Sequence, residues 1–374
     1  MKYSKYSRRQ AALADELAKR GLGAVMVSDF EHGRDSSLRY LCGQPSDAIF
    51  ILSAKGTSAL IAWDINMASR LGEADHIAAY TDFGRQPQKA LAAALKLLDV
   101  PKGAKVALPA STPYPDYIDF VHALTDFDLV CEKSGVGTFI QEMRARKDTD
   151  EIALYRRIAS NTDQLIDMIE KEICAGMLLT ETDIALFLER EARRMGAEGM
   201  GFETLAAGPE RSFGIHAFPT FTNEHFAAEG LSILDFGVRF EGYTSDVTMS
   251  FVSDSLRTEQ KTMVELVEEA HRIAVEACGP GVPLLSVAKL VDDFFAKAGW
   301  AMPHSLGHGI GLDAHEAPTL SMRADPSALL EPGHIVTIEP GLYHPEFGGV
   351  RLENDVLITE NRAEVLTHSR IVRL

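Results

Sequence analysis

Four carboxylates occupy positions in the sequence where strands would bury them. Asp235 follows the apolar run 231–234, and Asp246 lies in the apolar segment that returns after a turn containing glycine. The arrangement recurs downstream, where Glu339 ends an apolar run and Glu353 lies inside another. The separation is 11 positions in the first pair and 14 in the second. Each spacing suits a hairpin that brings its two acids together, so hairpins that face each other would gather all four.

Burial of these carboxylates is costly unless a cation neutralises them. For any one acid a turn amide or an arginine would suffice, and Arg351 stands two residues from Glu353 on the same expected strand face, which leaves an internal ion pair as an alternative. Four such coincidences favour a metal. Two divalent ions balance four negative charges, whereas a single ion leaves two of them uncompensated, so a pair of metals is the favoured interpretation.

Three histidines lie between the two acid pairs, in the segment PHSLGHGIGLDAHEAP. The glycines that interleave His304, His308 and His315 prevent a stable helix and predict a close-packed strand or loop. A lone histidine is usually a core residue, but three in this setting favour ligand or proton-transfer roles. One imidazole with four carboxylates suits divalent Mn, Co, Zn or Fe. A metal pair generates hydroxide from a bridging water, which is hydrolytic chemistry.

Helical and strand patterns alternate over the first ~130 residues and predict a separate α/β domain. The expected helices are 7–20, 89–98 and 115–124, and the expected strands are 24–27, 48–52, 60–63, 105–108 and 128–131. A densely charged stretch then precedes Asp148 and Glu151, whose spacing indicates a capping box for a long helix. We place the boundary near 134–147 and expect domains at 1–140 and 141–374.

The second part shows the same order of elements twice. Helices 150–172 and 181–195 precede strands with a hairpin at 231–251, and helices 258–278 and 285–298 precede strands with a hairpin at 335–358. No sequence identity supports a duplication, so the repeat is one of pattern only. It predicts a two-lobed α+β domain in which each lobe contributes one acid pair.

The composition sets the broad class. The chain has 374 residues, 46% of them hydrophobic, and 37 Lys and Arg against 54 Asp and Glu, a formal charge of −17. This apolar content is that of a globular protein, and the acidic excess disfavours nucleic acid as a partner. We expect no membrane association, since no run reaches ~18 apolar residues. Four widely spaced cysteines and no signal-peptide pattern fit the cytoplasm.

The motifs, taken in order, resemble one family of metalloenzymes. They read G-Y-x-S-D-x-T, then H-x3-G-H-G-x-G-L-x-x-H-E-x-P, then E-P-G-x-Y, then G-V-R-x-E-x-x-V-L. This series is similar to the pita-bread metallopeptidases, which include prolidase, aminopeptidase P and methionine aminopeptidase, with metal-free creatinase as a relative. The resemblance spans about 147–374 and implies a pita-bread α+β fold with pseudo-two-fold halves. A smaller creatinase-like α/β domain is expected to precede it.

The resemblance also implies roles for individual residues. The implied metal ligands are Asp235 for one ion, His308 and Glu339 for the other, and Asp246 and Glu353 as bridges between them. Glu339 is also the implied general base, and His315 the implied stabiliser of the tetrahedral oxyanion.

A second group of residues matches positions around the implied ligands. His216 would contact the substrate amide or shuttle a proton, and His304 would lie on the substrate side. Tyr343 and Arg351 would orient the two glutamates. A simpler alternative makes His216 an ordinary loop histidine and leaves Tyr343 and Arg351 as packing residues. One departure is Met249, which stands where relatives usually have arginine.

The leading hypothesis is a dinuclear hydrolase that uses a metal-bridging hydroxide to cleave the bond between an N-terminal residue and proline. Its substrates would be small peptides with proline in second position, and the expected assembly is a homodimer. The separate N-terminal domain argues against methionine aminopeptidase, and the complete ligand set argues against creatinase. A non-peptide hydrolase or lyase on the same fold is the alternative, motivated by Met249 and the unusual segment 206–223. A catalytically silent peptide-binding homologue is a third hypothesis.

Overall fold

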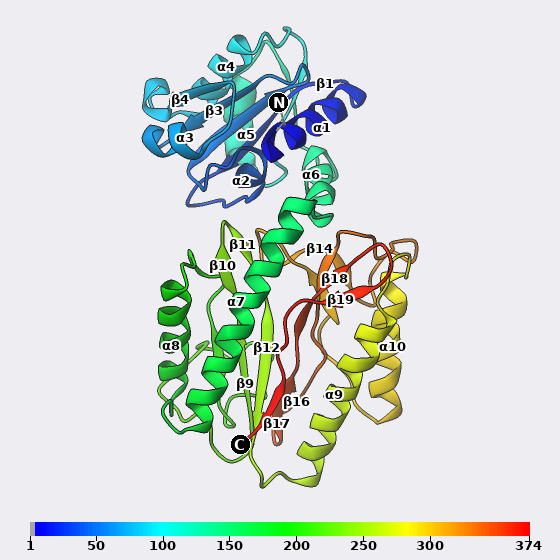
Figure 1. The fold of residues 1–374 in the computed structure, drawn as a ribbon. Coiled ribbons are helices and arrows are strands. Elements are labelled where there is room, and N and C mark those ends of the chain that lie inside the picture. Colours follow the sequence, from blue (N-terminus) through cyan, green and yellow to red (C-terminus); the bar gives the residue numbers. More distant parts are fainter. Residues whose placement is uncertain (1–3) are drawn as a thin grey trace. The chain divides into compact units, whose positions relative to one another are not determined.

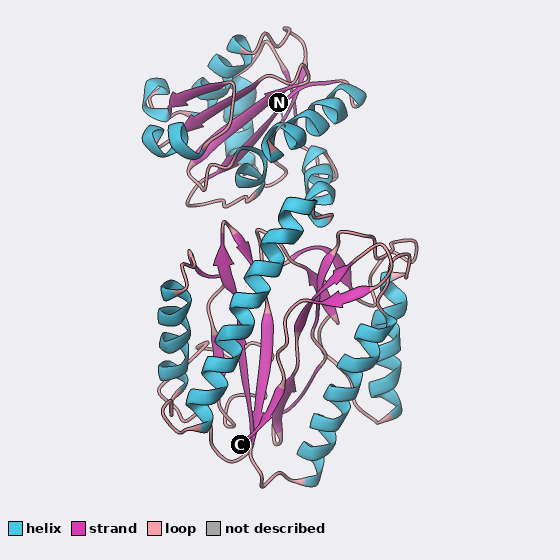
Figure 2. Ribbon diagram, in the orientation of Figure 1, coloured by secondary structure: helices cyan, strands magenta, loops and turns pink. Residues whose placement is uncertain are grey.

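The computed structural model describes residues 4–374, and the chain divides into two compact units, Met1–Arg144 and Ala145–Leu374. Each unit has its own sheet core with helices around it (Figures 1 and 2). Over the described range, no helix combines the length and the apolar character needed to cross a membrane.

The first unit is a mixed six-stranded sheet in the order β4-β3-β2-β1-β5-β6, in which only the β1/β2 and β2/β3 pairs are antiparallel. Its helices are α1 (Lys5–Lys19), α2 (Ser37–Cys42), α3 (Ile65–Leu71), α4 (Pro87–Leu97), α5 (Tyr114–Ala123) and α6 (Val136–Ala145), with the 3-10 helix η1 (Tyr80–Phe83). Its strands are β1 (Leu22–Asp29), β2 (Ala48–Ser53), β3 (Ser58–Ala62), β4 (His76–Ala79), β5 (Lys105–Ala107) and β6 (Asp128–Val130).

Every element expected from the sequence of this unit is present, within a few residues at each end. The sequence did not predict α2, α3, η1 or β4, which are all short and carry little periodic signal. The segment 134–147, expected as the domain boundary, carries helix α6, and the two units divide at residues 144 and 145.

The second unit repeats the order of two helices followed by strands, as the sequence predicts. The first half holds α7 (Thr149–Cys174), α8 (Glu181–Arg194), β7 (Gly199–Met200), β8 (Leu205–Ala207), β9 (Leu231–Phe236), β10 (Val238–Phe240), β11 (Tyr243–Thr244) and β12 (Val247–Val252). The second half holds α9 (Thr258–Ala277), α10 (Leu284–Lys297), β13 (Gly307–Gly309), β14 (Glu316–Leu320), β15 (Ile335–Ile338), β16 (Gly341–His344), β17 (Gly348–Arg351), β18 (Asn354–Ile358), β19 (Ala363–Val365) and β20 (Ile371–Arg373).

The predicted capping box at the start of α7 is confirmed. The Asp148 carboxylate accepts from the N–H groups of Asp150 and Glu151, and the Glu151 carboxylate accepts from the N–H of Asp148. These bonds satisfy N–H groups that the first turn of a helix leaves without partners, and they fix the point where the helix begins.

Helices α7 and α8 pack against strands of the first half of the second unit, and α9 and α10 pack against strands of the second half (Figure 1). The strands form a four-stranded sheet, β20-β12-β9-β8, and a five-stranded sheet, β14-β13-β15-β18-β19. Val267 of α9 and Val291 of α10 share one buried cluster with Val336 of β15 and Val356 of β18. The two sheets meet where the N–H of Glu353 donates to the carbonyl of Thr248 at 3.1 Å.

Candidate metal centre

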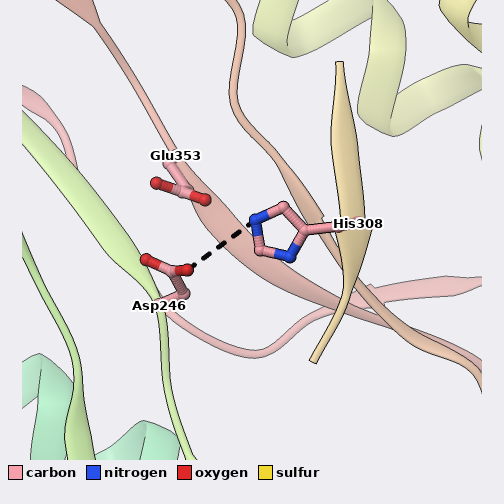
Figure 3. A group of neighbouring side chains, drawn as sticks. All are labelled: Asp246, His308 and Glu353. Atoms are coloured by element: carbon pink, nitrogen blue, oxygen red, sulfur yellow. Dashed lines mark ion pairs between the residues drawn. The ribbon is translucent and has the colours of Figure 1, made fainter. Parts of the chain in front are cut away.

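Three of the predicted ligands converge where the two sheets of the second unit meet. Asp246 immediately precedes β12, His308 lies in β13, and Glu353 stands between β17 and β18. All three are buried, and one ligand atom from each lies within 4.8 Å of the others (Figure 3). The Nε2 atom of His308 is 3.8 Å from Oδ2 of Asp246. Segments far apart in the sequence therefore point one imidazole and two carboxylates at a common position.

The other two predicted ligands flank this buried group. Oε1 of Glu339 is 3.4 Å from Nε2 of His308, and the negative charge of Asp235 contributes to raising the pKa of Asp246. Their side chains are 17% and 14% exposed, so they lie nearer the surface than the buried three. The Oδ1 atom of Asp235 is buried and has no hydrogen-bond partner among residues 4–374. A buried carboxylate oxygen without a hydrogen-bond partner keeps its lone pairs available to bind a metal ion.

The tautomer of His308 follows from its neighbours. Its Nδ1 lies 3.1 Å from the carbonyl oxygen of Gly309, which can only accept, so Nδ1 carries the proton. The lone pair is then on Nε2, which faces Asp246 and Glu339. Burial, followed by the neighbouring His315, lowers the pKa of His308 to about 4, so the ring stays neutral at pH 7. A neutral imidazole with a fixed tautomer is ready to bind a metal.

The predicted close packing of the glycine-rich segment is confirmed. A Cβ on Gly307 would lie 1.9 Å from the carbonyl oxygen of Thr337, and one on Gly309 would lie 2.0 Å from that of Ala317. Only glycine allows the backbone of β13 to approach its neighbours this closely. The glycines thus place His308 deep between the strands.

Burial disfavours the charged form of every carboxylate in the group. It raises the pKa of Asp246 and of Glu339 well above their ordinary values, and the nearby Glu353 raises both further. Burial, followed by the charge of Asp235, raises the pKa of Glu353 to about 7. Burial also raises the pKa of Asp235, where Arg351 opposes it. The positive charge that the protein places near these carboxylates is too small to stabilise all of them in the ionised form. A bound divalent cation would stabilise the ionised form.

Arg351 pairs with Asp235 rather than with the nearer residue in sequence, Glu353. Its Nη2 donates to Oδ2 of Asp235 at 2.6 Å, because β17 packs against β9 and presents the guanidinium to that strand. Nη1 donates to the Tyr343 hydroxyl at 2.8 Å, and that hydroxyl lies 3.1 Å from Nε2 of His304. Arg351, Tyr343 and His304 thus form one chain of hydrogen bonds beside the carboxylates.

Two threonines that the sequence analysis did not single out hold Glu353 in place. Thr248 donates to Oε2 of Glu353 at 2.7 Å and accepts from Nε of Arg351 at 2.9 Å. Thr337 also bonds to Glu353, and its hydroxyl accepts from the N–H of His308 at 3.2 Å. The signal in the sequence is weak, since both are single threonines in apolar strands, although Thr248 ends the G-Y-x-S-D-x-T motif.

The remaining predicted histidines lie around the same group. The rings of His315 and His308 are 4.1 Å apart between centroids, and burial lowers the pKa of His315. His216 is exposed on the long segment between β8 and β9, and its charge contributes to the pKa values of Asp235, His304 and His315. The structure therefore brings every predicted site residue to one region of the second unit.

Met249 does not face this region. It is fully buried and pairs with Leu234 of β9, whereas its neighbours Thr248 and Ser250 bond to Glu353 and Arg351 from the other face of β12. The departure from the usual arginine is therefore a change in core packing, not in the polar group.

The donor set fits divalent metal ions. Asp246, His308 and Glu353 converge, with Asp235 and Glu339 beside them. Oδ1 of Asp235 has no hydrogen-bond partner among residues 4–374, and Arg351 bonds to the other oxygen of Asp235. Oxygen-rich sites of this composition suit Mn, Fe, Co or Zn in the divalent state.

This two-lobed α+β architecture is that of the pita-bread metallopeptidases, which confirms the fold expected from the sequence. The model of metallopeptidase family M24 matches residues 153–360, and the chain belongs to that family.

Individual relatives agree with this assignment. An uncharacterized peptidase of Staphylococcus haemolyticus is 35% identical over 231 residues, which span 61% of this chain but only 64% of that relative. The Xaa-Pro dipeptidase of Pyrococcus horikoshii is 31% identical over 264 residues, covering 70% of this chain and 72% of the relative. The solved structure of an Xaa-Pro dipeptidase from Bacillus anthracis has a TM-score of 0.84 at 25% identity and covers 98% of this chain and 100% of that one.

Proposed function

We propose that this protein is a dinuclear metal-dependent peptidase that hydrolyses the bond between an N-terminal residue and proline. The convergence of Asp246, His308 and Glu353 within 4.8 Å, flanked by Asp235 and Glu339, carries the proposal. The similarity to proteins named Xaa-Pro dipeptidase supports the choice of substrate.

The five residues divide between two cations in this proposal. Asp235 would hold one cation, His308 and Glu339 would hold the other, and Asp246 and Glu353 would contribute to both. Divalent ions bound there would acidify a water as the nucleophile and would polarise the scissile carbonyl. Mn, Co, Zn and Fe all suit the donors.

Glu339 is the proposed general base. Its carboxylate is partly exposed and lies 3.4 Å from Nε2 of His308. A carboxylate placed beside the nucleophile can accept its proton and pass it to the leaving amine.

His315 and His304 are proposed to act on the substrate as neutral imidazoles. Burial lowers the pKa of both, to about 4 for His304, so neither ring adds positive charge to the site. The N–H of His315 is the proposed donor, because both ring nitrogens of His304 already bond to Ser305 and Tyr343. We assign His315 to the oxyanion that forms on the carbonyl and His304 to the substrate side. Tyr343 fixes His304 through the bond between its hydroxyl and Nε2.

Hydrolysis of a matched pair of peptides tests the proposal. The protein is stripped of metal, reloaded with Mn, Co or Zn, and given an Xaa-Pro dipeptide and an Xaa-Pro-Yaa tripeptide. We expect cleavage only after reloading, and the ratio between the two peptides separates a dipeptidase from an aminopeptidase. Full activity of the chelated protein would contradict the proposal.

Inactivity toward both peptides, despite bound metal, would instead favour a non-peptide hydrolase or lyase on the same site. Protein that cannot be loaded with metal would favour a silent peptide-binding homologue. We also propose a cytoplasmic homodimer, and light scattering of the purified protein tests the assembly.

A further inference from the structure

The segment that carries His216 is long and irregular. Residues 208–222 contain no helix or strand, and they join β8 toward β9 on the second unit. Loops of this length without secondary structure are uncommon in compact domains, and holding one in a single conformation costs chain entropy. Phe213 and Phe218 on it are 47% and 92% exposed, so little apolar burial offsets this cost. Polar anchors must hold the loop in place.

One buried carboxylate supplies the anchor at both ends of this loop. Oε1 of Glu181 accepts from the N–H of Gly208 at 2.7 Å and from Nε of Arg211 at 3.0 Å. Oε2 accepts from both the N–H and the hydroxyl of Thr222, each at 2.7 Å. Glu181 is fully buried and makes four hydrogen bonds to residues at the two ends of one loop.

A carboxylate is the side chain that this position requires. All four partners are donors, and only an ionised carboxylate offers acceptors on both oxygens. Arg211 balances the buried charge, and Glu181 is the first residue of α8, where the helix dipole favours an anion. Arg211 also donates to the carbonyl of Pro219, which ties the two limbs of the loop to each other.

Two further contacts direct the middle of the loop toward the candidate metal ligands. The Ser212 hydroxyl accepts from the N–H of Gly349 at 3.0 Å, and the carbonyl of Ile215 accepts from Nη1 of Arg351 at 3.2 Å. His216 follows directly after Ile215. The side chain of His216 therefore depends on a backbone that Glu181 holds at its base.

We propose that Glu181 is a positioning residue that fixes loop 208–222 and thereby sets His216 beside the catalytic group. The residue touches neither the metal ligands nor the substrate side in this role; it acts through the loop. The catalytic part of this inference rests on the proposed peptidase function, whereas the anchoring part does not.

Glu181→Gln is the test variant, because the amide turns one acceptor oxygen into a donor that faces donors. Asp183→Asn is the matched control, since its carboxylate bonds to the N–H of Thr180 in the same turn of α8 and the described contacts of Asp183 do not include the loop. Amide hydrogen exchange of 208–222 should be faster in the Glu181 variant and unchanged in the control. Unchanged exchange in both variants would overturn the proposal.

A double-mutant cycle then separates positioning from general damage. Glu181→Gln should lower kcat/KM by up to about 100-fold in the parent, as expected for a misplaced group. In a His216→Ala background the same change should cost less than about twofold, because the positioned group is gone. An equal loss in both backgrounds would show that Glu181 does not act through His216.

Two safeguards keep the outcome interpretable. If the Glu181 variant does not fold, Thr222→Val removes one of the four bonds and should shift exchange and kcat/KM in the same direction by a smaller factor. If the parent protein cleaves no Xaa-Pro peptide, the proposed function fails by itself, and hydrogen exchange alone decides whether Glu181 anchors the loop.

Discussion

The buried and outer parts of the candidate site are built in different ways. Asp246, His308 and Glu353 lie at or beside strands, and neither carboxylate has an ion pair with lysine or arginine within residues 4–374. By contrast, Asp235 bonds to Arg351, and His216 depends on a loop that Glu181 anchors. Side chains of the protein thus position the outer residues Asp235 and His216, whereas in the proposed peptidase the inner carboxylates are neutralised by bound cations.

Removing an inner ligand should have the largest effect. Glu353→Gln should lower kcat by about a thousandfold or more, because several kcal/mol of metal-dependent stabilisation is lost. Metal content measured after dialysis should fall with it. Glu364→Gln is the control, since Glu364 lies on the adjacent strand β19 and pairs with Arg156 at the surface. Retained metal and activity in the Glu353 variant would remove the distinction between the two regions.

Replacing an outer residue should separate chemistry from metal binding. His315→Ala should lower kcat by about 100- to 1,000-fold, as for loss of an oxyanion donor, while metal content stays at the parent level. Steady-state kinetics with metal analysis on the same sample measures both. Loss of metal together with activity would place His315 among the ligands instead.

The free energy of unfolding should depend on pH through the ionisation of the buried Glu353. Burial raises the pKa of Glu353 from 4.5 to about 7, so the folded metal-free protein binds more protons than the unfolded chain in this window. The contribution of Glu353 to the free energy of unfolding is fully present below pH 4.5 and is lost as pH rises through 7. The loss amounts to about 3 kcal/mol. Several buried histidines with lowered pKa values change stability in the opposite direction, so the comparison must isolate Glu353.

Chemical denaturation of metal-free parent and Glu353→Gln protein makes this comparison. The stability of the variant relative to the parent should be greater at pH 8 than at pH 5. A difference that does not vary with pH would mean that the carboxylate is not strained when it is ionised.

The smallest effect is expected for the outer ion pair. Arg351→Lys keeps the charge but cannot reach Asp235, Thr248 and Tyr343 together. We expect metal affinity to fall about 10- to 100-fold, as for other residues that orient ligands. Competition with a chelator measures the affinity, and an unchanged value would show that Arg351 only packs.

The sequence predicted the inner region better than the outer one. Asp246 and Glu353 stand out because acids are rare in apolar strands, and the glycines around His308 indicate a close approach of backbone. Both signals are local, so they are visible before the strands are paired.

The outer contacts depend on pairings that a single sequence does not reveal. Arg351 is two residues from Glu353 but pairs with Asp235, since β17 lies against β9. Glu181 looks like any acid in the first turn of a helix, and only the folded loop brings Gly208 and Thr222 to it.

Metal titration of the stripped protein tests the central claim most directly. Calorimetry with Mn, checked by elemental analysis, should give two bound ions per chain in the parent and fewer in an Asp246→Asn variant, with Xaa-Pro hydrolysis returning as the sites fill. Binding of no metal by a folded parent protein, or full hydrolysis before any metal is added, would contradict the account.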